Sequence, residues 1–219
     1  MTVEDARALV ANQALWPRIR DFLWDFAPQV HPSWLEAVPG LAELHLAPEG
    51  GMSPRIKRYV LDSIGVERCF HAFPADDWSR LLLLDGVTLE SVAKWLGAIA
   101  CAESLRSVMK GADVRDLKSV LPGVYPEVFG YMPYFSGLGI AAKPAKCAQD
   151  VVTVGFSMLF LAFADIPEPV VSRIKFKFPK SLCDFCAPCG KKGGAETVRS
   201  AISKLFKLKF PEAYKLCCS

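Results

Sequence analysis

The sequence lacks an uninterrupted apolar run of the roughly 20 residues that a membrane-spanning helix needs. One strongly apolar segment, residues 151–164 (VVTVGFSMLFLAFA), is bounded by Asp150 and Asp165 and has no charge between them. As an α-helix it would reach about 21 Å, short of the roughly 30 Å hydrocarbon core. A helix that is apolar on nearly every side is buried on nearly every side. We therefore expect residues 151–164 to form the central helix of a folded core.

Histidine is scarce, and no familiar catalytic motif is present. The three histidines, His31, His45 and His71, are each isolated from one another and from a recognisable companion. A catalytic or metal-binding histidine needs such companions. The glycines of Gly137–Gly139 lack both the spacing of a phosphate loop and the lysine-threonine pair that would follow it. We therefore predict structural histidines and a protein that is not an enzyme.

The beginning of the sequence, MTVEDARALV, lacks the basic start and apolar run of a secretory signal. Eight cysteines could form disulfides in a secreted protein. Without a signal, and with Cys217 next to Cys218, reduced thiols are favoured. The expected compartment is the cytoplasm.

A second CxxC pair, which would make a zinc site convincing, is also lacking. Cys183, Cys186 and Cys189 form a CxxCxxC run flanked by lysines. Three thiolates at this spacing can surround one metal, and a four-cysteine site suits zinc or an iron–sulfur cluster. The fourth ligand is open among Cys217, Cys218 and Cys147. The alternative function is thus a small metal-binding or redox-responsive helical protein, whereas the simpler interpretation is a loop of reduced cysteines with no cofactor.

Charge is distributed unevenly along the chain. Residues 172–219 contain eleven Lys or Arg and three Asp or Glu, so the remainder carries net negative charge although the whole chain is +3. A basic segment of this kind can meet an acidic protein, inner-leaflet lipid or nucleic acid, or can be a solvated face. DNA binding is not expected, because the helix pair that resembles a DNA reader offers few cations: its second helix sets Arg115 and Lys118 against Asp113 and Asp116.

Apolar spacing predicts helices throughout and no strands. One begins at Pro17, one at Pro54 with Ser53 as its cap, and a long one runs from Thr88 to Gly111 with small residues that allow close helix packing. We predict an all-α fold, a single compact irregular (orthogonal) bundle around residues 151–164. The predicted domains are a helical core at 1–180 and a basic, cysteine-containing segment at 181–219.

Two further segments bear on partners. Residues 122–139 (PGVYPEVFGYMPYFSGLG) are aromatic and interrupted by proline and glycine, which suits core sealing more than a partner groove. Residues 195–209 form a predicted amphipathic helix with Val198, Ile202, Leu205 and Phe206 on its apolar side. Packing against the bundle is favoured for this helix, and contact with anionic lipid is the alternative.

Four blocks of the sequence resemble a known family in their order and spacing. They are Phe26–Leu35 within DFAPQVHPSWL, Trp95–Leu121, the apolar Val154–Phe163, and Arg173–Pro179 (RIKFKFP). Together they are similar to the type III secretion sorting-platform accessory proteins, the SctK/YscK/OrgA family. The resemblance covers roughly residues 20–180, and the part beyond Lys180 matches least.

The resemblance implies a mostly helical, non-enzymatic adaptor in the bacterial cytoplasm, peripheral to the inner membrane and able to contact it. Such an adaptor would join the forkhead-associated-like cytoplasmic domain of the inner-membrane ring protein to the pod (C-ring-like) protein, and through the pod to the ATPase stator. It would bind no nucleic acid. The cations that we expect to contact partners are Arg173, Lys175 and Lys177 of the fourth block, with Arg55 and Arg58 on the open side of the helix at Pro54.

Overall fold

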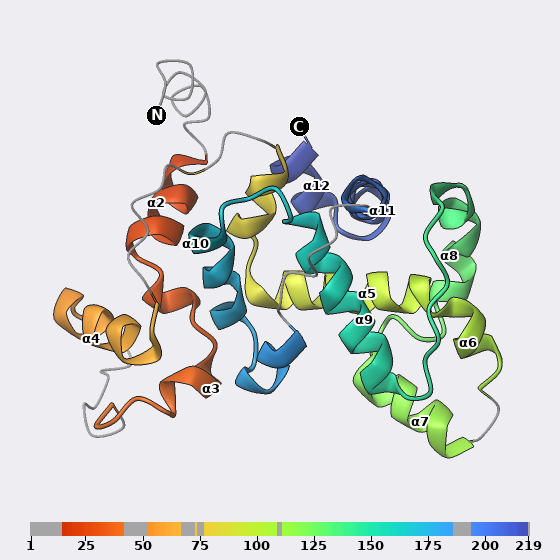
Figure 1. The fold of residues 1–219 in the computed structure, drawn as a ribbon, viewed down its shortest axis with the longest axis horizontal. Helices are drawn as coiled ribbons and strands as arrows, with labels where there is room; N and C mark the ends of the chain where they lie inside the picture. The colour runs from red at the N-terminus through yellow and green to blue at the C-terminus, as the bar shows by residue number, and fades with distance from the viewer. Residues whose placement is uncertain are drawn as a thin grey trace. The chain divides into compact units, whose positions relative to one another are not determined.

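The computed structural model describes residues 15–41, 52–66, 73, 77–108, 111–185 and 194–218. Within these ranges every regular element is an α- or 3-10 helix, which confirms the all-α class (Figure 1). The chain divides into two compact units. Unit 1 comprises residues 1–86 and 166–183, and unit 2 comprises residues 87–165 and 184–219. The division into 1–180 and 181–219 stays a prediction.

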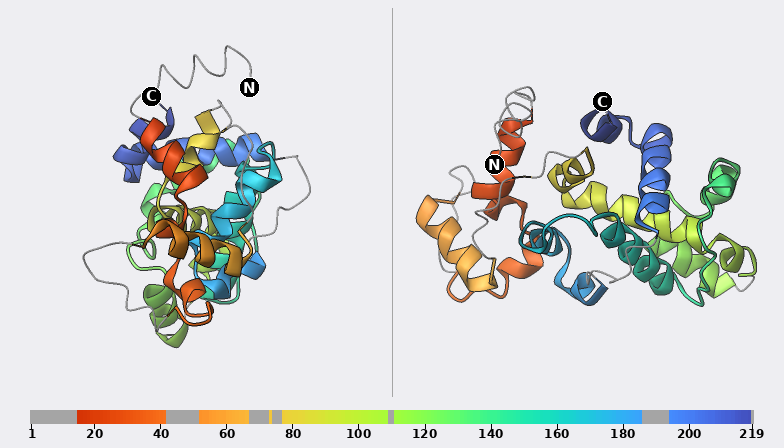
Figure 2. Two further views of the ribbon diagram at one scale, coloured as in Figure 1. Left: turned by 90° about the vertical axis from the view of Figure 1, so that its left-hand side faces the viewer. Right: turned by 45° about the horizontal axis from the view of Figure 1, so that its top comes forward.

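Unit 1 is built from short helices (Figure 2). Their bounds are α2 Trp16–Trp24, η1 Ala27–Gln29, α3 Pro32–Leu35, α4 Pro54–Ile64, η2 Asp77–Leu83, α10 Glu168–Val171 and η4 Ser172–Lys177. Proline sets the starts of α2, α3 and α4, where its missing N–H group would have had no helical partner. Ser53 caps α4 as expected, because its side chain accepts a hydrogen bond from Ile56 N.

The core of unit 1 is aromatic. Phe22 and Phe26, one turn apart, are fully buried and meet edge to face at 5.6 Å between ring centroids. Phe73 contacts Phe22 in the same geometry at 5.9 Å. Edge-to-face pairs of this kind add to the stability that apolar burial already gives. A satellite cluster around Val60 holds α4 against the chain that follows α3.

Unit 2 contains the longer helices. Their bounds are α5 Gly86–Ala100, α6 Ala102–Arg106, α7 Gly111–Val120, α8 Val128–Phe135, η3 Ser136–Leu138, α9 Ala148–Ala162, α11 Ala195–Lys209 and α12 Pro211–Cys218. A further 3-10 helix, η5 (Lys180–Phe185), lies across the boundary between the two units, which falls after Cys183. The packing of α9 against α7 and of α11 against α8, α9 and α12 forms the unit.

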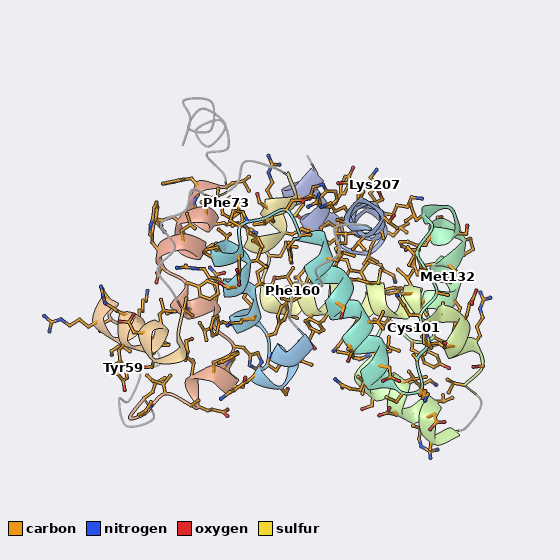
Figure 3. The ribbon with its side chains drawn as sticks, in the orientation of Figure 1. Tyr59, Phe73, Cys101, Met132, Phe160 and Lys207 are labelled. Carbon is orange, nitrogen blue, oxygen red and sulfur yellow. The ribbon has the colours of Figure 1, made fainter. Side chains whose placement is uncertain are left out.

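Helix α9 confirms the predicted buried helix, with bounds shifted from 151–164 to Ala148–Ala162. The helix ends two residues earlier than predicted, with Phe163 as its C-cap. At its N-terminus, Asp150 Oδ2 accepts hydrogen bonds from the backbone N–H groups of Lys146 (2.7 Å) and Cys147 (3.2 Å). These bonds lower the pKa of the Asp150 carboxyl and start the helix three residues earlier. Phe156 and Phe160 of this helix are buried, and Figure 3 labels Phe160.

Helices α5 and α9 cross at two glycines. A Cβ atom on Gly97 would lie 2.0 Å from the carbonyl oxygen of Val151, and one on Gly155 would lie 1.9 Å from that of Ala93. No side chain fits at either position, because the two backbones are in direct contact. The close approach predicted from the small residues of the 88–111 segment is therefore confirmed.

The long helix predicted from Thr88 to Gly111 is wrong in its extent. The chain turns at Cys101, so that α5 ends at Ala100 and α6 follows, while Gly111 begins α7 instead of ending a helix. The interruption has a physical cause. The carbonyl of Ala100 accepts the backbone N–H of Lys143 at 2.9 Å, and Ser104 Oγ donates to the carbonyl of Lys143. An inserted donor of this kind breaks the regular ladder and bends a helix.

Candidate protein-interaction surfaces

The basic segment that we expected on the surface lies inside unit 1. Only 4% of Arg173 and 3% of Lys177 is exposed. The Arg173 guanidinium donates from Nη1 to the carbonyls of Phe22 (2.8 Å) and Leu23 (2.9 Å) at the end of α2. It also lies over the Phe26 ring, 5.6 Å from the centroid. A cation at the carboxyl end of a helix satisfies carbonyls that have no helical partner and complements the helix dipole.

Lys177 likewise satisfies carbonyl groups at the carboxyl end of η2. Its Nζ donates to the carbonyls of Leu82 and Leu84, both at 2.7 Å, and lies 5.2 Å from the centroid of the Phe22 ring. Burial lowers the pKa of the Lys177 ammonium to about 7, against an opposing effect of the Asp85 carboxylate. The prediction that Arg173 and Lys177 contact a partner is therefore wrong for the folded protein, because both hold helix ends within unit 1.

Other contacts tie the same segment to α3. The backbone N–H of His31 donates to the carbonyl of Phe176 (2.8 Å), and Trp34 Nε1 donates to that of Phe178 (3.0 Å). His31 also caps α3, since its Nδ1 accepts from Ser33 N, which confirms the structural role expected of it. His45 and His71 lie outside the described residues. Apart from the half-buried Lys175, residues 173–178 are thus buried inside unit 1, although the cations of this segment were expected at the surface.

Lys175 lies between the two buried cations and is half-buried. Its Nζ is 4.8 Å from the centroid of the Phe176 ring, which is a cation–π contact. Lys175 therefore keeps part of its surface for solvent, and its contact with a partner stays a prediction.

Arg55 and Arg58 on α4 are exposed, as expected. Arg58 pairs with Asp62 one turn later at 3.5 Å, whereas none of the ion pairs found among the described residues includes Arg55. Tyr59 beside them is 43% exposed, and its hydroxyl donates to the carbonyl of Pro39 (Figure 3). Contact of Arg55 and Arg58 with a partner stays a prediction.

The outer face of α2 is a surface that the sequence analysis missed. Trp16 is 42% exposed and Trp24 is 62% exposed, and their rings meet edge to face at 5.7 Å between centroids. Arg20 lies between them in the sequence, four residues from each, and its Nη2 donates a hydrogen bond to Asp21 Oδ1 at 2.8 Å. The signal was available as a Trp-x₃-Arg-x₃-Trp pattern beside the buried Ile19 and Phe22. It was overlooked because only the apolar side of this helix was considered.

Unit 2 presents a second aromatic surface on α8. Tyr134 is 56% exposed, while Phe135 next to it is buried. Lys209 of α11 lies over the rings of Tyr131 (4.5 Å) and Trp95 (5.0 Å). The Lys209 ammonium also binds Glu127 at 2.7 Å, and this hydrogen bond raises the pKa of Lys209. The aromatic segment therefore both seals the unit and leaves one large ring exposed.

Helix α11 has the predicted bounds, Ala195–Lys209, and buries its predicted apolar side. Val198, Ile202, Leu205 and Phe206 are all at most 4% exposed, which confirms that the helix packs on the bundle. Its lysines contact neighbouring groups: Lys204 donates to the carbonyl of Tyr134, and Lys207 lies over the Tyr214 ring (Figure 3). No described helix is long and apolar enough to cross a membrane.

The side chains of Cys183, Cys186 and Cys189 lie outside the part of the chain that the structure describes. Of the candidates for a fourth ligand, Cys147 is exposed before α9 and Cys217 is buried in α12. Among the described residues, no three His, Cys, Asp or Glu side chains are grouped so that they could share a metal ion. The metal-binding alternative gains no support from this arrangement, and a zinc ion at the cysteine run stays a prediction.

Comparison with known proteins identifies one family. The model of the family described as YOP proteins translocation protein K (YscK) matches residues 21–127. Comparisons with curated proteins and with solved structures gave no match. The match over residues 21–127 confirms the resemblance to this type III secretion protein family that was found in the sequence.

Proposed function

We propose that this protein, which matches the YscK family over residues 21–127, is a non-enzymatic adaptor of a type III secretion sorting platform. In this role it binds the forkhead-associated-like cytoplasmic domain of the inner-membrane ring protein and the pod protein, and through the pod it reaches the ATPase stator. It acts in the bacterial cytoplasm, peripheral to the inner membrane, and is required for effector secretion.

One observation in the structure supports a two-partner protein. The chain forms two compact units, and each has its own exposed aromatic surface: Trp16 and Trp24 on α2 in unit 1, and Tyr134 on α8 in unit 2. Aromatic side chains that stay exposed on a folded protein are frequent anchors of protein interfaces. An adaptor needs two such surfaces and no reaction centre, and the family match supplies the system in which it works.

The test is reconstitution from purified components. The full chain, the cytoplasmic domain of the ring protein and the pod protein of the same bacterium are mixed in pairs and together, and the masses of the complexes are measured by sedimentation. We expect two binary complexes and one ternary complex. Binding of only one partner, or binding of the two partners in competition, would contradict the adaptor role.

A matched genetic test uses a strain that lacks the gene. Full-length protein should restore effector secretion, and the same protein carrying Trp24→Ala should restore less at equal abundance. Secretion that proceeds normally without the protein would exclude the proposed requirement.

A further inference from the structure

The outer face of α2 combines the two residue types most frequent in interface hot spots, tryptophan and arginine. Trp16, Arg20 and Trp24 follow one another at intervals of four residues, so they share one side of the helix. The adjoining side of the helix is buried through Ile19, Phe22 and Leu23. Two half-exposed indole rings in contact leave a contiguous apolar surface in water, and covering this surface is favourable.

The charge around this face is positive. The carboxylates of α2, of its C-cap and of α4 are each engaged by a cation: Asp21 by Arg20 at 2.8 Å, Asp25 by Lys57 at 2.8 Å, and Asp62 by Arg58 at 3.5 Å. The ion pair between Asp25 and Lys57 also joins the end of α2 to α4. Figure 2 (left) shows the ribbons of the two helices near each other.

Two further arginines lie on the same two helices, and Arg18, two residues from both Trp16 and Arg20, is to the side of the stripe that these residues form. Arg18 on α2 and Arg55 on α4 are exposed and belong to none of the ion pairs among the described residues. Electrostatic complementarity therefore favours an acidic partner surface.

The end of α2 is rigidly held. Arg173, buried behind the helix, binds the carbonyls of Phe22 and Leu23, the two residues that precede Trp24. A side chain on an anchored element loses less conformational entropy when it binds. Arg173 thus acts as a positioning residue for Trp24.

We propose that the outer face of α2 is a docking surface for an acidic protein surface with an apolar cleft, in which Trp16 and Trp24 enter the cleft and Arg18 and Arg55 meet carboxylates at its rim. The proposal rests on the adaptor function, and assigns this surface in unit 1 to one of the two partners.

The experiment measures the affinity of the full-length protein for each purified partner by titration calorimetry. The ring protein's cytoplasmic domain and the pod protein serve as the probes. We expect Trp24→Ala to weaken binding of one partner by about tenfold or more while the other stays within about twofold. The combined Arg18→Glu and Arg55→Glu variant should weaken the same partner, with an effect that shrinks as salt is raised.

Tyr134→Ala is the matched control, because Tyr134 is a similarly exposed aromatic residue in the other unit. It should leave the partner of α2 within about twofold of the wild-type affinity. Thermal unfolding of each variant is compared with wild type, and the double charge reversal tests the surface independently if Trp24→Ala proves unstable.

The outcomes separate this inference from the adaptor function. Wild-type protein that binds neither partner would remove the adaptor function itself. Wild-type binding that survives both Trp24→Ala and the double charge reversal would overturn the docking surface alone. If Trp24→Ala only causes a dimer of this chain to dissociate, the outer face of α2 is a dimer interface and the proposal is rejected. The proposal would also be rejected if Trp24→Ala only loses binding to vesicles of phosphatidylcholine and phosphatidylglycerol.

Discussion

Unit 1 and unit 2 hold their helices in place by different means. In unit 1 the carboxyl ends of α2 and η2 are bound by the buried cations Arg173 and Lys177. In unit 2 the principal helices meet backbone to backbone at Gly97 and Gly155. Unit 1 is therefore sensitive to the loss of a charge, and unit 2 to the gain of a single carbon atom.

A buried cation is present in unit 2 as well, but its surroundings differ. Arg199 donates from Nε to the carbonyl of Ala162 at the end of α9, and it is also paired with Asp165 (3.1 Å) and Glu196 (3.0 Å). Both carboxylates reach solvent, so the guanidinium has partly solvated counter-ions. The ammonium of Lys177 lies instead on neutral carbonyls, which explains why burial affects its pKa so strongly.

The largest effect is expected at the helix crossing of unit 2. Gly97→Ala places a carbon where Val151 O already lies, and the backbones must separate. We expect a loss of about 3 kcal/mol or more in the free energy of unfolding, measured with chemical denaturant. Gly130→Ala in α8 is the control, because a Cβ there meets nothing within 4 Å. It should be neutral or stabilising by up to about 1 kcal/mol. Equal stability of the two variants would show that the backbones of α5 and α9 are far enough apart at Gly97 to accept a Cβ atom.

In unit 1 the comparable change is Arg173→Met. Methionine preserves the unbranched, packed part of the arginine side chain but removes the donor for the buried carbonyls of Phe22 and Leu23. We expect a loss of about 2–4 kcal/mol. Lys175→Met in the same segment should lose less than about 1 kcal/mol, since Lys175 is half-buried and contacts only a ring face. A similar loss for both variants would mean that the buried hydrogen bonds of Arg173 do not add to the free energy of unfolding.

The next effect is a pH dependence confined to unit 1. The pKa of Lys177 is about 7 in the folded protein and 10.5 when exposed, so between these values the unfolded chain binds more protons. The free energy of unfolding should then rise from pH 7 to pH 10.5, by up to about 1 kcal/mol per pH unit. Below pH 7 both states are protonated and the dependence vanishes. The Lys177→Met variant should lose this rise, and its persistence would assign it to another group.

Unit 2 should show a smaller dependence of opposite sign. Burial raises the pKa of the Cys101 thiol from 9.0 to about 11, with a further contribution from the Asp150 carboxylate. Between these values the unfolded chain has lost a proton that the folded protein keeps, so stability should fall from pH 9 to pH 11. Unfolding of the Cys101→Ala variant, followed in the same range, should lack this fall. An unchanged fall would contradict the role of Cys101.

The sequence indicated the long helices more reliably than the charged residues. Helices α9 and α11 could be predicted because their apolar pattern alone demands burial, and α11 was found at its predicted bounds. Arg173 and Lys177 could not be placed, because nothing local distinguishes a buried cation from an exposed one. Their acceptors lie far away in sequence: Arg173 binds a carbonyl 150 residues earlier, and Lys177 one 93 residues earlier. The turn at Cys101 was missed for the same reason, since the donor that causes it belongs to Lys143.

The two units alternate along the chain, and this order has a consequence for synthesis. Residues 166–183, which carry Arg173 and Lys177, leave the ribosome only after residues 87–165 of the other unit. Until then, α2 and η2 lack the cations that bind their carboxyl ends. The aromatic core of unit 1 is also incomplete, because its last segment has not been synthesised. Ribosome-bound chains that stop before residue 166 should therefore expose this core to proteases and chaperones. The nascent protein therefore acquires a finished unit 1 only after residue 183 has been added.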